Sequence, residues 1–346
     1  MDIIQHEILV KLPSKPLLRC HEPEFVSTHI KKCQNNQEET RLLVLEPPDL
    51  GYYEQICSIR SSKNFRRMSG LDIELFWHGH YQAVGYINGL LCLKTYRSKT
   101  QPYKILLWNP SIKKALQLPR FQITSAVEVR FDVDCAFGYD VVKNDYKVVV
   151  SLYIGSGYQI PSFVHIFTLS TFSWKHAEVG YGTHCLWIKN GPKVFLDGVV
   201  YWAGNDVTKV IKKGRYTHFV SFDVASEEFK NIDLPDCEEG NLWDHERFPI
   251  VLDQTLGLME NFETFTHIWI RDKGKDKVES WKRIYVIRLQ LLHKCLLFKP
   301  DGEFLFAGET GGVKSYNIKS QETKVLAKSY KISLILLAST RRVWPY

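Results

Sequence analysis

The chain has 346 residues, of which 45% are hydrophobic, 24% charged and 13% aromatic. These values are typical of a globular protein with a large core, and they exclude a chain that is disordered throughout. The net charge of +7 is modest for this length, and Lys and Arg are spread along the chain. We therefore expect neither a nucleic acid nor a membrane as partner, and no apolar run reaches the length of a membrane span.

The eight cysteines are scattered, and none forms a Cys-x-x-Cys pair. This pattern argues against a zinc cage and against a disulfide framework. Cys92 and Cys295 lie in the apolar runs "NGLLCL" and "HKCLLF", where a buried free thiol is the usual state. No secretory signal precedes the first motif. We expect a soluble protein of a reducing compartment, cytoplasmic or nuclear, with no metal and no cofactor.

Short helices are predicted for residues 1–33. "DIIQHEILVKL" places its apolar residues at helical spacing, with Asp2 positioned as the N-cap. Pro13 ends this helix, and "SKPLLR" begins a second one that Pro23 stops early. "QNNQEET" (34–40) is predicted to be a polar linker.

From residue 41 onward, short apolar strands alternate with turns rich in Gly, Asn, Asp and Pro. A repeated unit emerges when the turns are aligned on Ser111, Thr171, Ser226, Val278 and Ser320. In all but the first unit, a Lys stands four residues after the aligned position. The residues directly before this Lys are Trp174, Phe229, Trp281 and Thr323. An apolar strand such as "VHIF" precedes each of these turns. In most units a second strand, which starts at a Gly turn as in "DGVVYW", comes before that apolar strand.

Each unit therefore predicts a small antiparallel sheet whose last hairpin carries the repeated turn. The segments "RLLVLEP" and "YYEQICSI" near the start and "SLILLAST" near the end supply one more sheet. The first and last segments would share this closing blade, which removes exposed sheet edges. The predicted fold is mainly β: a six-bladed β-propeller over residues 41–346. A pair of β-sandwiches is the alternative architecture.

No group of residues has the pattern of a catalytic or metal site. His78 and His80 in "WHGH" lack a third ligand nearby, and "GETGG" (308–312) lacks the Lys of a phosphate loop. The acids of "DCEEGNLWDHE" (236–246) are expected in a solvated loop. A propeller hydrolase acting on glycans, which would need clustered carboxylates at a central channel, is the enzymatic alternative.

Aromatic residues fall into two groups. We expect a structural role between blades for Trp108, Trp174, Trp202, Trp269 and Trp281, which lie in or beside the repeated strands. Target recognition is instead expected on the loops that fit the repeat least, namely 120–132, 153–162, 180–192, 204–216 and 236–248. The aromatic and basic residues there that would anchor a partner are Tyr158, Tyr181, Trp187, Arg215, Tyr216, Trp243 and His245.

Several motifs together resemble those of a known family. "DIIQHEILVKLPSKPLLR" resembles the first two helices of a plant F-box, and "PEFVSTHI" resembles its end. "NGLLCL", "LWNPSIKKALQLP", "FGYDVVKNDYKVV" and "SFDVASEEFKNIDLP" resemble the plant F-box-associated (kelch-like) domain in order and content. "FVSTHI", "WNPS", "NDYK" and "SFDVASEEF" look most similar to the S-locus F-box and S-haplotype-specific F-box proteins of pollen.

The resemblance spans essentially the whole chain, and it implies a non-catalytic substrate-recognition subunit of an SCF-type ubiquitin ligase. Residues 1–33 would be the F-box that binds a Skp-type adaptor and, through it, cullin. Residues 41–346 would hold an as yet unidentified target protein. The likeness to S-locus proteins implies an S-RNase as target, in self-incompatibility. Such ribonucleases are often basic, and the positive charge of this chain offers them no electrostatic attraction.

The F-box is truncated internally compared with the family. Only "CHE" stands between Arg19 and Pro23, where family members carry a longer stretch that includes a Trp. The adaptor contacts that remain are Ile8, Leu9, Leu12, Pro13, Leu17 and Leu18. Each lost apolar contact removes about 1.5–3 kcal/mol, and about 1.4 kcal/mol is tenfold in affinity, so we expect weakened docking. A propeller binding module that no longer docks on the ligase is the alternative function.

Overall fold

The computed structural model describes residues 41–46, 55–61, 63–67, 73–75, 81–95, 103–109, 114–121, 131–154, 163–177, 185–187, 192–206, 217–236, 246–262, 264–273, 279–288, 294–298, 303–307, 312–328 and 334–338. In these segments the secondary structure is β-strand, and no helix occurs. The helices predicted for residues 1–33 and the linker 34–40 lie outside the described residues. A search of the described part found no helix with the length and apolar character needed to cross a membrane.

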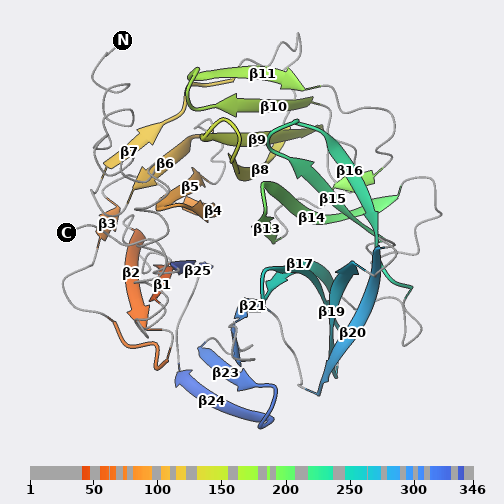
Figure 1. The fold of residues 1–346 in the computed structure, drawn as a ribbon. Coiled ribbons are helices and arrows are strands. Elements are labelled where there is room, and N and C mark those ends of the chain that lie inside the picture. The colour runs from red at the N-terminus through yellow and green to blue at the C-terminus, as the bar shows by residue number, and fades with distance from the viewer. Residues whose placement is uncertain are drawn as a thin grey trace, which may run out of the picture. The chain divides into compact units, whose positions relative to one another are not determined.

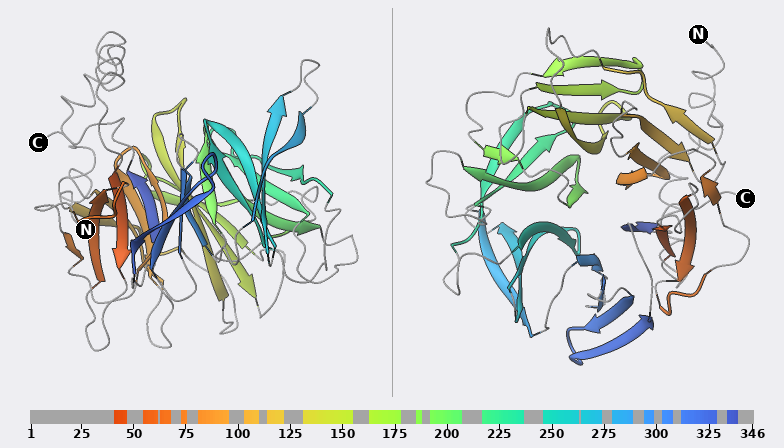
Figure 2. Two further views of the ribbon diagram at one scale, coloured as in Figure 1. Left: turned by 90° about the horizontal axis from the view of Figure 1, so that it is seen from below. Right: turned by 180° about the vertical axis from the view of Figure 1, so that it is seen from behind.

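The chain divides into two compact units, one made of Met1–Leu118 with Ser333–Tyr346 and the other of Pro119–Ile332. We call them unit 1 and unit 2. Every sheet belongs to one unit or the other, and all strand pairs within the sheets are antiparallel (Figure 1). Each sheet is twisted, as the two views of Figure 2 show.

Unit 1 contains two four-stranded sheets. The first has the order β25-β1-β2-β3, with β25 (Leu334–Ala338), β1 (Arg41–Glu46), β2 (Gln55–Ser61) and β3 (Ile73–Leu75). The second has the order β4-β5-β6-β7, with β4 (Tyr81–Ile87), β5 (Leu90–Thr95), β6 (Ile105–Asn109) and β7 (Lys114–Gln117).

The first sheet of unit 1 joins the two ends of the chain. Strand β25 pairs with β1 so that Leu336 lies opposite Leu43, and β2 covers the other edge of β1. The prediction that "RLLVLEP", "YYEQICSI" and "SLILLAST" build one sheet is therefore confirmed. In the second sheet every residue of β5 is buried, and Cys92 on this strand is buried and not part of a disulfide, as predicted.

Unit 2 contains four sheets. The order β11-β10-β9-β8 comprises β8 (Phe131–Asp140), β9 (Asp145–Ile154), β10 (Phe163–Thr168) and β11 (Ser173–Ala177). The order β12-β14-β15-β16, with β13 also pairing with β14, comprises β12 (Cys185–Trp187), β13 (Lys193–Leu196), β14 (Val199–Asp206), β15 (His218–Asp223) and β16 (Phe229–Asp233). The last two sheets run in chain order, with β17 (Glu246–Leu252), β18 (Thr255–Asn261), β19 (Thr266–Lys273) and β20 (Glu279–Ile287), then β21 (Lys294–Phe298), β22 (Glu303–Ala307), β23 (Val313–Asn317) and β24 (Glu322–Ala327).

The mainly β, propeller-type fold is thus confirmed, but the prediction of six similar blades is not. Five sheets, not six, have the four-stranded form typical of a propeller blade, because the sheet of β12–β16 has a fifth strand. Two short strands, β12 and β13, pair with successive parts of β14 there. Closure of the sheets into one ring concerns both units together and stays a prediction.

The core of unit 2 consists of apolar layers between consecutive sheets. Val164 and Ile166 of β10 pack with Val220 and Phe222 of β15 in the first layer. Alternate residues of a strand point to opposite faces, so Phe219 of β15 enters the next layer. That layer also contains Leu256 and Leu258 of β18, and a third lies between β17–β20 and β21–β24, with Phe248, Ile268, Phe304 and Phe306. A sheet that lies between two of these layers is buried on both faces, and its strands therefore have nearly continuous apolar sequences.

The repeated turn lies in the last hairpin of each sheet, as predicted, wherever its residues are described. Thr171 lies between β10 and β11, Ser226 between β15 and β16, and Ser320 between β23 and β24. The repeated Lys residues follow on the outermost strands β11, β16, β20 and β24 as Lys175, Lys230, Lys282 and Lys324, and all four are exposed. Charged side chains on edge strands hinder pairing with another chain, which gives this repeated Lys a structural reason.

The aromatic residue before the repeated Lys links consecutive segments. The indole N–H of Trp174 donates to the carbonyl of Pro119 at 2.7 Å, and that of Trp281 donates to the carbonyl of Asp233 at 2.7 Å. Trp281 thereby ties β20 to the end of β16 in the preceding sheet. Trp108 and Trp202 are buried, and Trp269 and Trp281 pack against the layer between β12–β16 and β17–β20. The structural role predicted for these tryptophans is confirmed.

Candidate interaction site

The strands from β8 to β20 present two different ends. At one end, which we call the turn end, tight turns join β8 to β9, β13 to β14, β15 to β16 and β17 to β18. At the opposite end, the loop end, the chain leaves β9 at Ile154 and β14 at Asp206, and it enters β17 at Glu246. Of the loops predicted to bind a target, 153–162 and 204–216 leave their strands at the loop end, and 236–248 enters β17 there.

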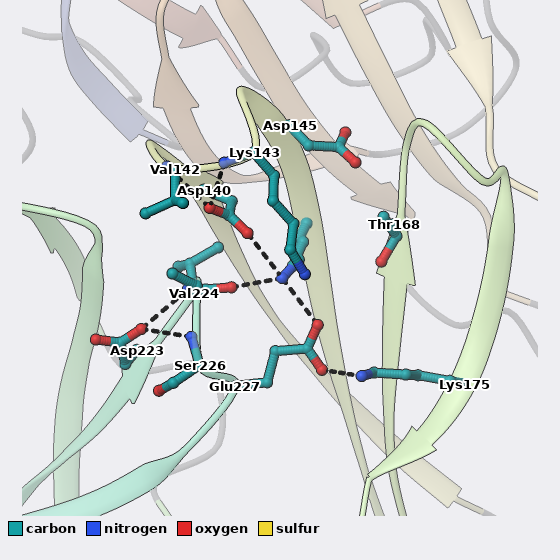
Figure 3. A network of polar contacts seen from close by, with 12 residues as sticks. Asp140, Val142, Lys143, Asp145, Thr168, Lys175, Asp223, Val224, Ser226 and Glu227 are labelled. Carbon is teal, nitrogen blue, oxygen red and sulfur yellow. Dashed lines mark hydrogen bonds and ion pairs between the residues drawn. The ribbon is translucent and has the colours of Figure 1, made fainter.

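Lys147 of β9 organises the turn end, where its side chain is only 1% exposed. Its ammonium lies 3.1 Å from Oδ2 of Asp140 and 2.8 Å from Oε1 of Glu227, and it donates to the carbonyl of Val224 at 2.6 Å. Figure 3 shows these partners arriving from two sheets, Asp140 from β8 and the other two from the turn between β15 and β16. Glu227 also pairs with Lys175 of β11. The network therefore fastens two consecutive sheets of unit 2 to each other.

The charges in this network favour one another. Burial alone would lower the pKa of Lys147, but hydrogen bonds and charge attraction from Glu227 and Asp140 outweigh burial and raise the pKa. Burial would raise the pKa of Asp140 and of Glu227, but the hydrogen bonds and positive charge that each carboxylate receives lower both values. All three groups are thus held in their charged forms at neutral pH.

The sequence "FGYDVVKNDYK" also shapes the turn itself. The carboxylate of Asp140 accepts hydrogen bonds from the backbone N–H groups of Val142 and Lys143, both at 3.0 Å. A Cβ on Gly138 would lie 2.5 Å from Cγ2 of Val224, so only glycine permits this approach of the two sheets. The motif is therefore a structural clamp between neighbouring sheets.

A second polar cluster lies at the loop end of β17–β20, in a single row across the sheet. Strand register places Arg247 of β17 opposite Glu260 of β18, Glu260 opposite His267 of β19, and His267 opposite Val286 of β20. Directly opposed residues share a face of the sheet, so these four side chains point the same way. Arg247, Glu260 and His267 are buried, whereas Val286 is 53% exposed. The row thus leads from a buried ion pair to the surface.

Glu260 is the centre of this row. Its Oε1 accepts hydrogen bonds from Nε of Arg247 at 2.7 Å and from Nη2 of Arg247 at 2.5 Å. Its Oε2 lies 3.3 Å from Nδ1 of His267 and 3.3 Å from the indole nitrogen of Trp269. Arg247 also donates to the carbonyl of Pro235 at 3.0 Å. This last bond joins the residues on either side of segment 236–246, which contains two of the predicted target-binding residues.

Aromatic rings cover the outer part of the row. Phe262 and Phe265, in the connection between β18 and β19, stack with ring centroids 4.4 Å apart. The His267 ring lies 5.0 Å from Phe262 and 4.9 Å from Phe265. Arg283 of β20 places its guanidinium 5.6 Å from the centroid of Trp269 and 3.5 Å from Nε2 of His267. Both phenylalanines are half-buried and Arg283 is exposed, so this end of the sheet presents aromatic surface beside a cation.

The arrangement is suited to recognition of another molecule. Aromatic residues and Arg are the side chains most often responsible for affinity in protein interfaces.

The buried carboxylates Asp134, Asp140 and Glu260 each pair with a Lys or Arg, as with Asp134 and Lys193 at 2.8 Å. Within the described segments, no group of three or more His, Cys, Asp or Glu side chains could hold a metal ion. His78 and His80 lie outside those segments.

Most of the residues predicted from the sequence to bind partners fall outside the described part of the chain. This is true of all the adaptor contacts, Ile8, Leu9, Leu12, Pro13, Leu17 and Leu18, and of Tyr158, Tyr181, Arg215, Tyr216, Trp243 and His245. Trp187 was expected in a loop, but it lies on strand β12. The predicted loop 236–248 was likewise too long, because β17 begins at Glu246.

The sequence reasoning missed the row of Arg247, Glu260 and His267. These residues lie on three different strands, and their sequence separation has no pattern that marks them as neighbours. The strand register that brings these three residues together depends on where β17 begins. The polar sequence around the start of β17 hides this point. A usable signal was the pair Glu260 and His267 on either side of the short β18–β19 connection, since a hairpin sets such residues opposite each other.

Comparison with known proteins identifies the family. The family model described as "F-box associated beta propeller domain" matches residues 50–318. F-box protein CPR1 of Arabidopsis thaliana is 26% identical over an alignment covering 99% of this chain and 81% of that protein. F-box protein At1g52495 of the same plant is 23% identical, with 90% of this chain and 72% of that protein covered.

A solved structure is similar in fold. The crystal structure of TolB from Acinetobacter baumannii superposes with a TM-score of 0.52 at 10% sequence identity, covering 87% of this chain and 66% of that one. At such low identity the likeness concerns the fold alone. Since the family model matches well over half of the 346 residues, the chain belongs to the family of proteins with an F-box associated β-propeller domain.

Proposed function

We propose that the chain is a substrate-recognition subunit of an SCF-type ubiquitin ligase. The observation that carries this proposal is the family match over residues 50–318, together with relatives that are F-box proteins over nearly the whole length of this chain. In this role the protein catalyses no reaction. It raises the effective concentration of the target beside the ubiquitin-conjugating enzyme.

Residues 1–33 are proposed to dock on a Skp-type adaptor and, through it, on cullin, with 34–40 as linker and 41–346 as the target-binding domain. The docking residues are Ile8, Leu9, Leu12, Pro13, Leu17 and Leu18. Because the segment between Arg19 and Pro23 is short, fewer apolar groups are available for the adaptor. Loss of two or three such groups, at about 1.5–3 kcal/mol each, turns a nanomolar contact into a micromolar one.

The proposed target surface is the loop end of unit 2. The interlocked sheets of unit 2 support this assignment, because recognition loops need a rigid scaffold. Tyr158, Tyr181, Trp187, Arg215, Tyr216, Trp243 and His245 remain the proposed anchors there. An S-RNase in self-incompatibility is the target suggested by the resemblance to S-locus proteins, although a basic target gains nothing from the +7 charge of this chain.

Reconstitution tests the function. The full chain is mixed with purified Skp-type adaptor, cullin and RING subunit, and complex formation is followed by size-exclusion chromatography. Co-elution that disappears in a Leu9→Asp, Leu17→Asp variant supports the proposal, provided that the variant keeps its thermal midpoint. A chain that never co-elutes at concentrations of about 100 µM, well above a micromolar Kd, would instead favour a propeller binding module that has lost ligase docking.

A further inference from the structure

We propose that His165 and His176 form a two-histidine binding site for a divalent transition-metal ion. The two residues lie on β10 and β11, the two outer strands of the sheet β11-β10-β9-β8 (Figure 1). No metal is predicted from the sequence, because the two histidines stand on different strands and form no local motif. The proposed ligase function neither requires nor implies this site.

Strand register brings the two imidazoles together. His165 lies directly opposite His176 in the antiparallel pair of β10 and β11, so both side chains leave the same face of the sheet. Their ring centroids are 5.5 Å apart, with the ring planes at 65° to each other. Two imidazoles bound to one ion at about 2.0–2.1 Å, with a tetrahedral angle between them, have centroids about 5 Å apart. The observed spacing is therefore close to that of a chelating pair.

The ring nitrogens of this pair are not engaged by other polar groups. Within the described part of the chain, no hydrogen bond or ion pair involves either imidazole, and each lies against other rings. His218 and His267 differ, because their rings meet the carboxylates of Asp233 and Glu260. A neutral imidazole has one nitrogen with a free lone pair, and this nitrogen is the atom that binds a metal ion.

The surroundings keep His165 in the form that binds metal. Burial lowers the pKa of His165, and the positive charge of His176 lowers it further. A ring that is already neutral at pH 7 need not lose a proton before it binds an ion. Of the nearest cations in sequence, Lys175 points to the opposite face of the sheet and pairs with Glu227, and Arg120 is exposed to solvent.

Aromatic neighbours restrict the motion of both rings. Phe121 stacks on His165, with centroids 5.7 Å apart and the planes at 21°. Phe163, on the same face of β10 as His165, meets the His176 ring edge-on at 6.4 Å. Phe121 is itself held by an edge contact with Trp174 at 5.4 Å. Ligands that are oriented before binding lose less conformational entropy when the ion arrives.

The ligand set selects the class of ion. Imidazole nitrogen suits Zn²⁺, Ni²⁺ and Cu²⁺, whereas Ca²⁺ and Mg²⁺ prefer oxygen ligands. His165 is half-buried and His176 is exposed, so an ion held between them is accessible from solvent. Two protein ligands leave the other coordination positions to water or to a side chain of a bound partner. The site is therefore open, unlike the closed four-ligand sites of structural zinc.

Point variants separate this pair from the other histidines of the chain. His176→Gln removes the exposed ligand on the outermost strand, where a change of side chain is least disruptive to the fold, and His165→Gln removes the second ligand. The control is His78→Gln with His80→Gln, because these are the two histidines that stand closest together in the sequence. Thermal unfolding and circular dichroism establish that each variant is folded before binding is measured.

Binding of Ni²⁺ alone to the full, reduced chain is measured by isothermal titration calorimetry. The histidines involved are located by their protection from diethyl pyrocarbonate, which mass spectrometry reads residue by residue. We expect saturable binding that His176→Gln and His165→Gln each weaken at least about tenfold, because a second ligand on the same rigid sheet adds avidity. The control should weaken binding less than about threefold, since it leaves both ligands in place. Mg²⁺ should give neither heat nor protection.

The proposal is overturned if Ni²⁺ does not bind, if it binds without protecting His165 and His176, or if the control weakens binding as much as His176→Gln does. Unchanged protection of His165 in His176→Gln would also overturn it, because the two rings would then bind independently. Adaptor docking through residues 1–33 is a separate measurement. A chain that binds the adaptor but not Ni²⁺ would contradict this proposal and leave the proposed function intact.

Discussion

Lys147 of β9 and Glu227 of the β15–β16 turn belong to different sheets, yet their charged groups lie 2.8 Å apart. The lysine is almost completely buried, and Asp140 is its second carboxylate partner. An ion pair away from water is stable only when every charge has a partner. The sequence "NDYK" thus ends in a lysine that acts between sheets rather than at the surface.

Replacement of this lysine should be costly. In Lys147→Met the buried Asp140 loses its counter-charge and Glu227 keeps only the exposed Lys175, so we expect the free energy of unfolding to fall by about 3–5 kcal/mol. Urea denaturation followed by tryptophan fluorescence measures the change. Lys143→Met is the matched control, because Lys143 is exposed in the same turn, and it should change stability by less than about 0.5 kcal/mol. Equal effects of the two substitutions would contradict the role of Lys147.

The same network predicts how stability depends on acid. Asp140 and Glu227 have folded-state pKa values below their ordinary values of 3.8 and 4.5. Their contribution is therefore complete above about pH 4.5 and is lost as the pH falls through the lowered values. The wild-type chain should lose stability more steeply than Lys147→Met below pH 4.5, as measured by denaturation at a series of pH values. Parallel curves for the two proteins would show that the network contributes nothing.

Gly138 is predicted to tolerate no side chain. A Cβ at this position would overlap Cγ2 of Val224, so Gly138→Ala should lower the free energy of unfolding by about 1–3 kcal/mol. Val224→Ala removes the overlapping methyl group, and the double variant should be more stable than the sum of the single effects predicts. A double-mutant cycle measures this coupling, and strict additivity would contradict the proposed contact.

The row at the loop end gives a further prediction. Glu260→Gln keeps the shape of the side chain but leaves the buried Arg247 without its counter-charge, so we expect a loss of about 3–5 kcal/mol. In the background Arg247→Met, the same Glu260→Gln change should cost much less, since no buried cation remains. Chemical denaturation of the two single variants and the double variant provides the test. A full cost in both backgrounds would show that the pair is not coupled.

Much of the fold could be predicted because the repeat is local. The Gly turns, the apolar strands after them and the turns at Thr171, Ser226 and Ser320 all specify hairpins within short stretches of sequence. The innermost strands were harder to recognise. β17 begins with the polar pair Glu246 and Arg247, and its Arg is buried only because Glu260 meets it across the sheet.

The candidate site was harder still to predict. Arg283 reaches the face of Val286 only because a β-bulge shifts the register between β19 and β20. Sequence periodicity alone places residues three apart on opposite faces of a strand. The sequence did single out Trp269 and Trp281, and their predicted packing role was correct. It could not show that the Trp269 ring would also support an exposed arginine.

The most direct test of the account is the affinity of the full chain for a purified Skp-type adaptor, measured by isothermal titration calorimetry. We predict a Kd in the micromolar range, about 1–100 µM, which is lost when residues 1–33 are removed. Binding that persists without residues 1–33, or no heat of binding from the full chain at about 100 µM, would contradict the assignment of this protein as a ligase subunit with a weakened F-box.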